Sequence, residues 1–431
     1  MLDSARRLMA PSSRSAVPPF MVMDVVAAAA RLQAAGRRVI HMEIGQPAAG
    51  APAAAIMAAQ AALAGDRGRL GYTESLGIPS LRQRIASHYA QRYGADIDAE
   101  RIVVTTGSSA GFLLAFLALF EPGDRVAMAS PGYPPYRNLL AALDCEAVAL
   151  PVSAASRFAL APDVLLAEHR RRSLKGLLIA NPANPTGTMM TQTALGALIG
   201  AAESAGIACI CDEIYHGLDY EFAPQTAAKL SGNAVVINSF SKYFCMTGWR
   251  VGWMVMPEAL IRPVERLQQN LAISVPTLSQ VAAAAAFDGR AEMEAVKRGY
   301  EVNRQLLLEG LPGLGGLGAA PGLAGLPGPG LPKLAGPTGP GLPGLPGLMA
   351  AGFDRFPPPD GAFYIYADVS RFCDDSFAFA SRMLEEAGVA VAPGVDFDPI
   401  DGHRFVRFCY AGTTAEVSEA LERIGAWLRR G

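Results

Sequence analysis

Short apolar runs alternate with helical stretches between residues 52 and 290, and this pattern constrains the fold more than any other feature of the chain. The runs lie at 102–105, 125–129, 147–150, 176–179, 206–211, 235–237 and 251–255. Each is continuously apolar or β-branched, as strands are when helices cover both of their faces. The sequence therefore predicts an α/β fold built on a mostly parallel sheet.

The segments on either side of this region predict a second, smaller unit. Residues 22–36 place apolar side chains at helical spacing, and a short strand follows before a Gly-Gln-Pro turn. A long helix is expected at 291–309, then strands at 362–366 and 404–409 and helices at 376–387 and 414–429. We predict an N-terminal segment (1–51) that joins the small domain, a large domain (52–290) and a small α+β domain (291–431).

Residues 310–349 consist mostly of Gly, Pro, Leu and Ala and fit neither pattern. Glycine recurs every third residue in patches such as GLPGLPG, but the spacing slips at Gly315-Gly316 and at Gly339-Pro340-Gly341. A collagen triple helix needs a strict repeat and three chains. We expect a mobile low-complexity insertion that interrupts the small domain.

The composition argues against several classes of partner. The 37 basic and 39 acidic residues give a net charge of −2, so no general positive field attracts nucleic acid or an anionic membrane. No segment has the roughly 18 apolar residues of a membrane span, and the N-terminus lacks the apolar core of a secretory signal. The six cysteines form no CxxC pair, which predicts no metal site and a reducing, cytoplasmic location.

A lysine follows an apolar strand in Asn238-Ser-Phe-Ser-Lys242, and Arg250 comes eight positions later. A lysine amine that is desolvated or near another cation loses its proton readily and can form a covalent C=N bond with a carbonyl. Arg250 offers a planar fork of donors to a phosphate, and the hydroxyls of Ser239 and Ser241 can add to it. The segment predicts a reactive lysine beside a phosphate site, with a solvated turn as the structural alternative.

An acidic residue ends the apolar strand in Ile207-Ala-Cys-Ile-Cys-Asp212-Glu-Ile-Tyr215. Open α/β sheets bind ligands at this end of their strands. A buried carboxylate is costly unless it meets a cation or a base that shares its proton, and the pyridine nitrogen of pyridoxal phosphate is such a base. Tyr215 can then hydrogen-bond the phenolic oxygen of the ring. A helix-capping aspartate is the alternative.

Two turns complete the pattern. In Asn181-Pro-Ala-Asn184-Pro-Thr-Gly187, two Asn-Pro steps favour an extended turn that presents Asn184 to the site. Residues 107–109 (Gly107, Ser108 and Ser109) lie between a strand and an apolar helix expected at 110–120, where small residues let backbone N–H groups meet an anion. The chain has no GxxxxGK[ST] string, which argues against a nucleoside triphosphate site.

With these four motifs in this order, the chain resembles the class I/II aminotransferases, fold-type-I pyridoxal-phosphate enzymes of the aspartate aminotransferase superfamily. The resemblance extends from PPFMVMDV to RFVRFCYA, and the strings NPANPTG, CDEIY and SFSKYFCMTGWRVGW carry it. It implies a seven-stranded sheet between helices, pyridoxal 5'-phosphate as cofactor, and a cytoplasmic homodimer that shares its active sites and works in amino-acid metabolism.

The resemblance also implies a role for each residue of the site. Lys242 would bind the cofactor covalently, Asp212 would pair with the pyridine nitrogen, and these two with Tyr215 form the catalytic set. The substrate α-carboxylate would be held by Arg407, in FVRFCYA, with Asn184 and Gly45. Tyr215 and Asn184 would contact the ring oxygen of the cofactor, and Tyr133 would stack on its ring. The phosphate would be bound by Arg250, Ser239, Ser241, Gly107, Ser108 and Ser109, together with Tyr72 of the neighbouring subunit.

The resulting hypothesis is a transaminase that moves an amino group between an L-amino acid and a 2-oxo acid by a ping-pong mechanism. Ser109 stands where one branch specific for acidic substrates has a lysine, so we expect a neutral donor, with Arg137 as the candidate substitute cation. One alternative is a C–S β-lyase or related eliminase on the same scaffold. A second is a non-catalytic interaction protein that uses the fold and the Gly/Pro-rich insertion.

Overall fold

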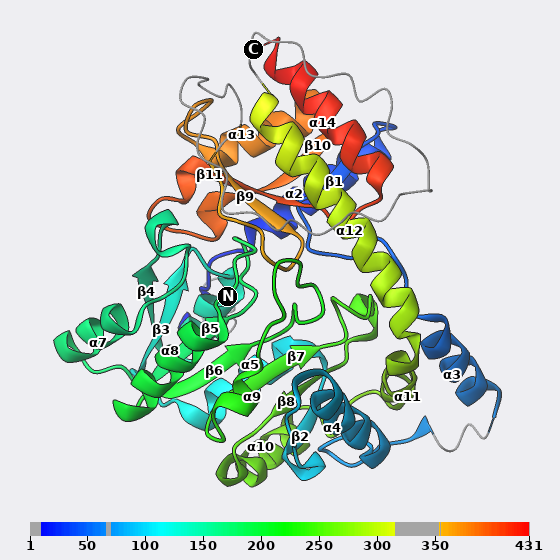
Figure 1. Cartoon of the computed structure of the whole chain (residues 1–431), viewed down its shortest axis with the longest axis vertical. Helices are drawn as coiled ribbons and strands as arrows, with labels where there is room; N and C mark the ends of the chain where they lie inside the picture. Colours follow the sequence, from blue (N-terminus) through cyan, green and yellow to red (C-terminus); the bar gives the residue numbers. More distant parts are fainter. Residues whose placement is uncertain (1–9, 66–69, 315–352, 354, 431) are drawn as a thin grey trace, which may run out of the picture.

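The larger of the two β-sheets has seven strands in the order β2-β8-β7-β6-β5-β3-β4. The computed structural model describes residues 10–65, 70–314, 353 and 355–430 (Figure 1). Strand β8 pairs antiparallel with both of its neighbours, whereas the other pairs in the sheet are parallel. The predicted α/β class with a mostly parallel seven-stranded sheet is therefore confirmed. The strands are β2 (Ile102–Thr105), β3 (Arg125–Ser130), β4 (Glu146–Pro151), β5 (Gly176–Ala180), β6 (Ala208–Asp212), β7 (Val235–Ser239) and β8 (Gly252–Val255).

Helices cover both faces of this sheet, which explains why its strands are continuous apolar runs. Along β6, Cys209 and Cys211 belong to one hydrophobic cluster and Ile210 belongs to the other. The first face packs against α4 (Pro79–Tyr93), α8 (Gln192–Ser204) and α11 (Thr277–Ala286). The opposite face packs against α5 (Gly107–Leu119), α6 (Pro134–Ala142) and α10 (Glu258–Leu271).

The second sheet has four strands in the order β1-β10-β11-β9, and it joins the two ends of the chain. Strand β1 (Ile40–Met42) pairs parallel with β10 (Val389–Pro393), and β11 (Phe405–Cys409) pairs antiparallel with β10 and with β9 (Tyr364–Asp368). Figure 1 shows α12 (Arg290–Gly310) running from the end of α11 to this sheet, beside α14 (Thr414–Leu428). Helices α2 (Met21–Ala34) and α13 (Ser376–Arg382) also pack here.

The structure corrects several predicted boundaries. Strand β10 was not predicted, although it lies between β1 and β11 in the sheet. Strand β9 begins two residues later than expected, and the helix predicted at 376–387 is α13 followed by a π-helical turn, Met383–Ala387. Helix α5 begins at Gly107, so the predicted glycine-serine turn is the first turn of the helix itself.

Most of the predicted insertion at 310–349 lies outside the described residues. Its first residues are described: α12 ends at Gly310, and Leu311–Gly313 form a 3₁₀ turn. Leu311 and Leu314 are buried in the main hydrophobic cluster, so the first residues of this segment pack against the rest of the fold. Within the described part of the chain, no helix is both long and apolar enough to span a membrane.

Candidate active site

A cavity of about 250 Å³ lies where the C-terminal ends of the parallel strands meet residues of the four-stranded sheet. Open α/β sheets bind their ligands at this edge. The wall contains residues from the N-terminal segment, from loops after β3, β5, β6 and β7, and from β9 and β11. The residues of the predicted site that line the cavity are Gly45, Ser108, Ser109, Tyr133, Asn184, Asp212, Tyr215, Ser241, Lys242, Arg250 and Arg407.

Lys242 lies just beyond the end of β7, and its amine points into the cavity. Nζ donates a hydrogen bond to the carbonyl of Gly45. A Cβ atom at Gly45 would overlap the hydroxyl of Tyr364, so the backbone can approach this closely only because the residue is glycine. Burial lowers the pKa of Lys242 to about 8. A substantial fraction of the amine is therefore neutral, and nucleophilic, near physiological pH.

Asp212 ends β6, and both of its carboxylate oxygens are hydrogen-bonded. Oδ1 accepts the backbone N–H of Ile214 at 3.0 Å, and Oδ2 accepts the hydroxyl of Tyr136. Burial raises the pKa of Asp212 to about 6, against the opposing effect of these two hydrogen bonds and of the charge on Lys242. The site therefore holds a carboxylate that can be ionised at neutral pH and lies within reach of a ligand in the cavity.

Tyr136 was not among the predicted site residues. It follows Tyr133 by three positions, and α6 begins at Pro134. Residues three apart on a helical turn lie on one face, so this spacing is the signal by which the sequence could have identified Tyr136. The structure places both tyrosines in the wall of the cavity.

The N-terminus of α5 and the guanidinium of Arg250 form one end of the cavity. Gly107 has φ +71°, and a Cβ atom there would lie 2.5 Å from Nη2 of Arg250. The free N–H groups of the first helical turn and the guanidinium are therefore close enough to bind one anion together. Ser241 lines the same region.

Two predicted phosphate ligands support this end of the cavity without lining it. The Ser239 hydroxyl lies 2.9 Å from Oγ of Ser241 and accepts the backbone N–H of Ser241 at 3.1 Å. Gly107 contributes no side chain, and its lack of a Cβ atom leaves room for the guanidinium of Arg250.

At the opposite side of the cavity, Arg407 on β11 is a buried cation with neutral partners only. Nη1 donates to Oδ1 of Asn184 at 2.8 Å, and Nη2 donates to the carbonyl of Glu43. The guanidinium carbon lies 4.2 Å from the ring centre of Tyr364 and 4.6 Å from that of Phe397.

Within the described chain, the hydrogen-bond partners of the Arg407 guanidinium are neutral, and Nε has none. The nearby Asp396 carboxylate acts on Arg407 through its charge without forming an ion pair. The Arg407 side chain is nevertheless buried, with 2% of the residue exposed. A buried charge without a counter-ion is costly, and guanidinium binds carboxylates in bidentate geometry. This arrangement fits an anionic ligand that arrives from solution.

Near Arg407, the hydroxyls of Tyr215 and Tyr364 lie 2.8 Å apart. Tyr364, on β9, was another residue that the sequence analysis missed. Its signal was weak because it belongs to an apolar strand, where an aromatic residue is most simply explained by packing.

Much of the remaining cavity wall is apolar, and part of it comes from the N-terminal segment. Its apolar members are Phe20, Val22, Met23, Ile44, Phe112, Pro135, Leu139 and Ile214, and the polar side chains of Gln46 and Thr247 also line it. The first turn of α2 is held by Asp396, whose Oδ2 accepts the backbone N–H of Val22 at 3.0 Å.

Arg137 is not brought into the cavity. Its Nη2 donates to the carbonyl of Asp396 and lies 4.0 Å from Oδ1 of the same residue. The structure therefore does not support the sequence-based suggestion that Arg137 serves as a second cation for the substrate.

Tyr72 also lies away from the cavity of its own chain. Its side chain is 83% exposed, and the loop that carries it packs on the segment before and within α11. Oγ1 of Thr277 donates to the carbonyl of Gly71 at 2.5 Å, and Nε2 of Gln280 donates to Oγ1 of Thr73 at 3.0 Å.

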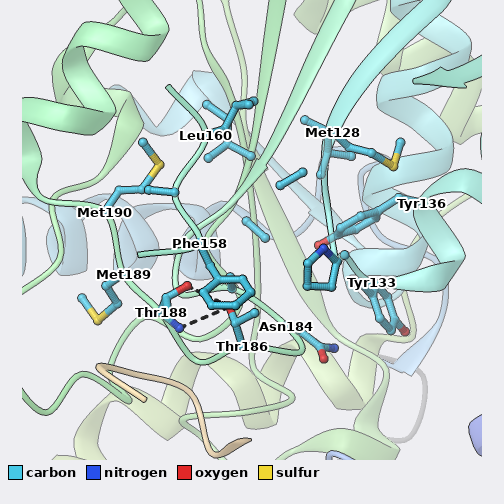
Figure 2. Close-up of a pocket in the computed structure, with 18 of the residues that line it drawn as sticks. Met128, Tyr133, Tyr136, Phe158, Leu160, Asn184, Thr186, Thr188, Met189 and Met190 are labelled. Atoms are coloured by element: carbon cyan, nitrogen blue, oxygen red, sulfur yellow. Dashed lines mark hydrogen bonds between the residues drawn. The ribbon is translucent and has the colours of Figure 1, made fainter. Parts of the chain in front are cut away.

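Behind Tyr133 and Asn184 is a second, smaller chamber of about 50 Å³ (Figure 2). Tyr133, Tyr136 and Asn184 line both cavities and so form the partition between them. Figure 2 shows the Phe158 ring and the side chains of Leu160 and Met190 around this chamber. Its wall contains no charged side chain, so we assign the chemistry to the larger cavity.

Among the described residues, no group of three or more His, Cys, Asp or Glu side chains is arranged to hold a metal ion. All six cysteines are free, and five of them are buried.

Comparison with known proteins agrees with this geometry. Residues 37–325 and 345–424 match the family model described as Aminotransferase class I and II. The unmatched interval, 326–344, falls within the Gly/Pro-rich segment. A valine–pyruvate aminotransferase of Mycobacterium tuberculosis is 45% identical over 419 residues, which are 96% of this chain and 97% of that protein.

Solved structures give the same result. The crystal structure of an aminotransferase from Mycobacterium tuberculosis has a TM-score of 0.85 at 45% identity and covers 98% of this chain and 99% of its own. The aspartate aminotransferase from Thermus thermophilus with maleate has a TM-score of 0.80 at 28% identity, and the match covers 96% of this chain and 99% of the other.

Proposed function

The chain belongs to the aminotransferase class I and II family and is a pyridoxal-phosphate-dependent transaminase, and from this premise we propose that its amino donor is a neutral L-amino acid. The acceptor is a 2-oxo acid, and the two half-reactions alternate in a ping-pong cycle. The observation that supports an amino-acid donor is Arg407, a buried cation without an ion-pair partner in the described chain, in the same cavity as Lys242.

The residues of the cavity fit pyridoxal phosphate. Gly107 leaves room for the guanidinium of Arg250 beside the N-terminus of α5, which suits a phosphate, and Ser108, Ser109 and Ser241 add donors there. Asp212 suits a protonated ring nitrogen. Asn184 and Tyr215 suit the ring oxygen, and Tyr133 suits the ring face. When bound, the cofactor supplies an aldehyde that captures amines and a ring that withdraws electrons.

Each protein group then has a defined task. Nζ of Lys242 would hold the cofactor through its aldehyde group, and the same amine would accept the proton of the substrate α-carbon. Its pKa of about 8 supports this role because the neutral amine is available near neutral pH. Asp212 would supply the negative charge that pairs with the ring nitrogen. Arg407 binds the α-carboxylate and so orients the α-carbon toward Lys242.

The preference for a neutral donor rests on the apolar wall formed by Phe20, Val22, Met23, Ile44 and Leu139. The cations that line the cavity are Lys242, Arg250 and Arg407, and each already has a task. A second carboxylate on the substrate would therefore lose its hydration without gaining a partner. The relative named valine–pyruvate aminotransferase points in the same direction.

We further propose a homodimer in which each subunit lends Tyr72 to the phosphate site of its partner. Tyr72 is 83% exposed, and Leu271 (55%) and Ile273 (49%) are exposed nearby in the sequence segment on which its loop packs. Ile273 has φ +63°, a conformation that is strained for a β-branched residue and that clusters at functional sites. Exposed apolar side chains of this kind suit a subunit interface.

The remaining proposals concern organisation and location. We propose the domain division at 1–51, 52–290 and 291–431, supported by the separate seven-stranded and four-stranded sheets. We propose a cytoplasmic location, which is supported by six unpaired cysteines.

The competing functions are less well supported. A C–S β-lyase would use the same lysine and aspartate, but the relatives reported above are named aminotransferases. A non-catalytic interaction protein has no physical need for Lys242, Asp212 and Arg407 in one cavity.

One assay separates these possibilities. Purified protein loaded with pyridoxal phosphate should show a visible absorption band that borohydride removes, and should convert alanine or valine to the 2-oxo acid only when a 2-oxo acid acceptor is present. Release of pyruvate from cystathionine without an acceptor would instead identify an eliminase. A protein with no cofactor band and no turnover would support a binding role.

A further inference from the structure

The hydroxyl of Tyr136 donates a hydrogen bond to Oδ2 of Asp212, and none of the roles assigned so far includes it. Tyr136 is 3% exposed and its pair with Asp212 is fully inside the protein. Because a charge-assisted hydrogen bond to a carboxylate is among the stronger polar interactions, it should influence where the proton of Asp212 resides.

The ring of Tyr136 is held so that this hydrogen bond has a defined direction. Its centre lies 5.0 Å from the ring of Phe112 on α5 and 5.2 Å from the ring of Tyr133, which it meets nearly edge-on. These contacts come from two helices on the same face of the large sheet. The packing depends on the aromatic ring, whereas the interaction with Asp212 depends on the hydroxyl alone.

Other titratable groups also act on Asp212. Lys242 is the cation whose charge stabilises the ionised form. Glu213 and Cys211 are neighbours along the chain, and Tyr133 lies on the adjacent helical turn. Oδ1 of Asp212 is already bonded to the N–H of Ile214, so Tyr136 is the side-chain donor to this carboxylate among the described residues.

We propose that Tyr136 is a positioning residue that keeps Asp212 ionised and oriented toward the ring nitrogen of pyridoxal phosphate, and that it thereby sets the pH below which the cofactor is lost. The inference rests on the proposed pairing of Asp212 with the ring nitrogen. Its physical basis is that a donor to the ionised form favours that form.

The test is the affinity of the full-length apo protein for pyridoxal phosphate as a function of pH, followed by quenching of tryptophan fluorescence. Tyr136→Phe keeps the ring and removes only the hydroxyl. Loss of a donor makes the Asp212 carboxylate harder to ionise. The fall in cofactor affinity on the acid side of the profile, called the limb below, should therefore move up by about one pH unit. Below the limb the variant should bind about tenfold more weakly, and well above it the two proteins should bind equally.

Three further variants make the result specific. Tyr133→Phe removes a neighbouring phenol that does not bond Asp212 and should leave the limb in place. Tyr136→His restores a donor and should return the limb toward its original position. Asp212→Asn should remove the part of the limb near pH 6, where Asp212 titrates, while the dependence on the Lys242 amine near pH 8 stays. Tyr136→Phe should then shift nothing further.

The outcomes distinguish a failure of the role proposed for Asp212 from a failure of the role proposed for Tyr136. If Asp212→Asn leaves the limb in place, the assigned role of Asp212 fails, and the inference fails with it. If Asp212→Asn removes the limb but Tyr136→Phe weakens binding equally at every pH, Tyr136 only packs against its neighbours and the inference alone is overturned. The spectrum of the bound cofactor gives a second readout, because its pH midpoint should shift in Tyr136→Phe but not in Tyr133→Phe.

Discussion

Arg407 Nη1 lies 2.8 Å from Oδ1 of Asn184, although the two residues are 223 positions apart. Arg407 belongs to the four-stranded sheet, and Asn184 belongs to the loop after β5 of the seven-stranded sheet. The part of the cavity that contains Arg407 is thus assembled from both sheets. Ser130 and Asp398 make a second link, with 3.0 Å between Oγ and Oδ1.

Replacement of Arg407 tests the substrate site. Arg407→Lys should lower kcat/KM by about 100-fold or more, mainly through KM, because an ammonium cannot reproduce bidentate binding and a buried charge pair is worth several kcal/mol. The absorption of the bound cofactor should not change. Arg404→Lys is the matched control, because Arg404 pairs with Asp368 and neither residue lines the cavity. Equal losses in both variants would contradict the assignment.

Removal of the Lys242 amine tests the catalytic centre. Lys242→Ala should fold, retain some cofactor through its other contacts, and lose at least about 10³-fold in turnover, since both covalent attachment and proton transfer depend on this amine. Lys175→Ala, at an exposed position, should have normal activity. Near-normal turnover in Lys242→Ala would exclude the proposed mechanism.

The pH dependence of cofactor capture follows from the lowered pKa of Lys242, about 8. Only the neutral amine attacks an aldehyde, so the second-order rate of reconstitution should rise about tenfold per pH unit below 8 and level off above it. Stopped-flow absorbance measures this rate. An inflection near the ordinary lysine pKa, about 10.4, would mean that the amine is not desolvated in the apo protein.

Subunit mixing tests the shared active site. A Tyr72→Ala variant and a Lys242→Ala variant, each inactive or nearly so, should regain activity when mixed under exchange conditions. Random pairing makes half of the dimers mixed, each with one intact site, so about a quarter of the original sites should return. Restoration should fail if Tyr72 serves its own subunit, and a fully active monomer would refute the arrangement.

The charge of the substrate side chain tests the apolar wall. With one fixed acceptor, kcat/KM for alanine and phenylalanine should be at least as high as for aspartate. Arg137→Met should leave these ratios unchanged, because Arg137 is bound to Asp396. A hundredfold preference for aspartate, about 2.7 kcal/mol, would reveal a basic partner outside the cavity described above.

A helix or strand could be predicted where the pattern of its own residues reflects how it is buried. The large sheet is buried on both faces, so its strands are apolar without interruption, and that pattern can be read from a few residues. Strand β10 could not be predicted in the same way. It is a short run of Ala, Val and Pro, and it is a strand because β1 and β11, which are distant in sequence, provide its hydrogen-bond partners.

The sequence by itself determined the aminotransferase family and the candidate side chains: Lys242, Asp212, Asn184 and Arg407 were predicted from motifs whose residue types and spacing are local, and all four line one cavity. Only the tertiary structure decided which groups meet. In the folded chain, the Tyr136 hydroxyl donates a hydrogen bond to Asp212, 76 residues away. Arg137 donates to the carbonyl of Asp396, and Tyr72 is exposed. The physical reason is that a motif is encoded in consecutive residues, whereas the direction of a side chain depends on packing and charge contributed by segments far away along the chain.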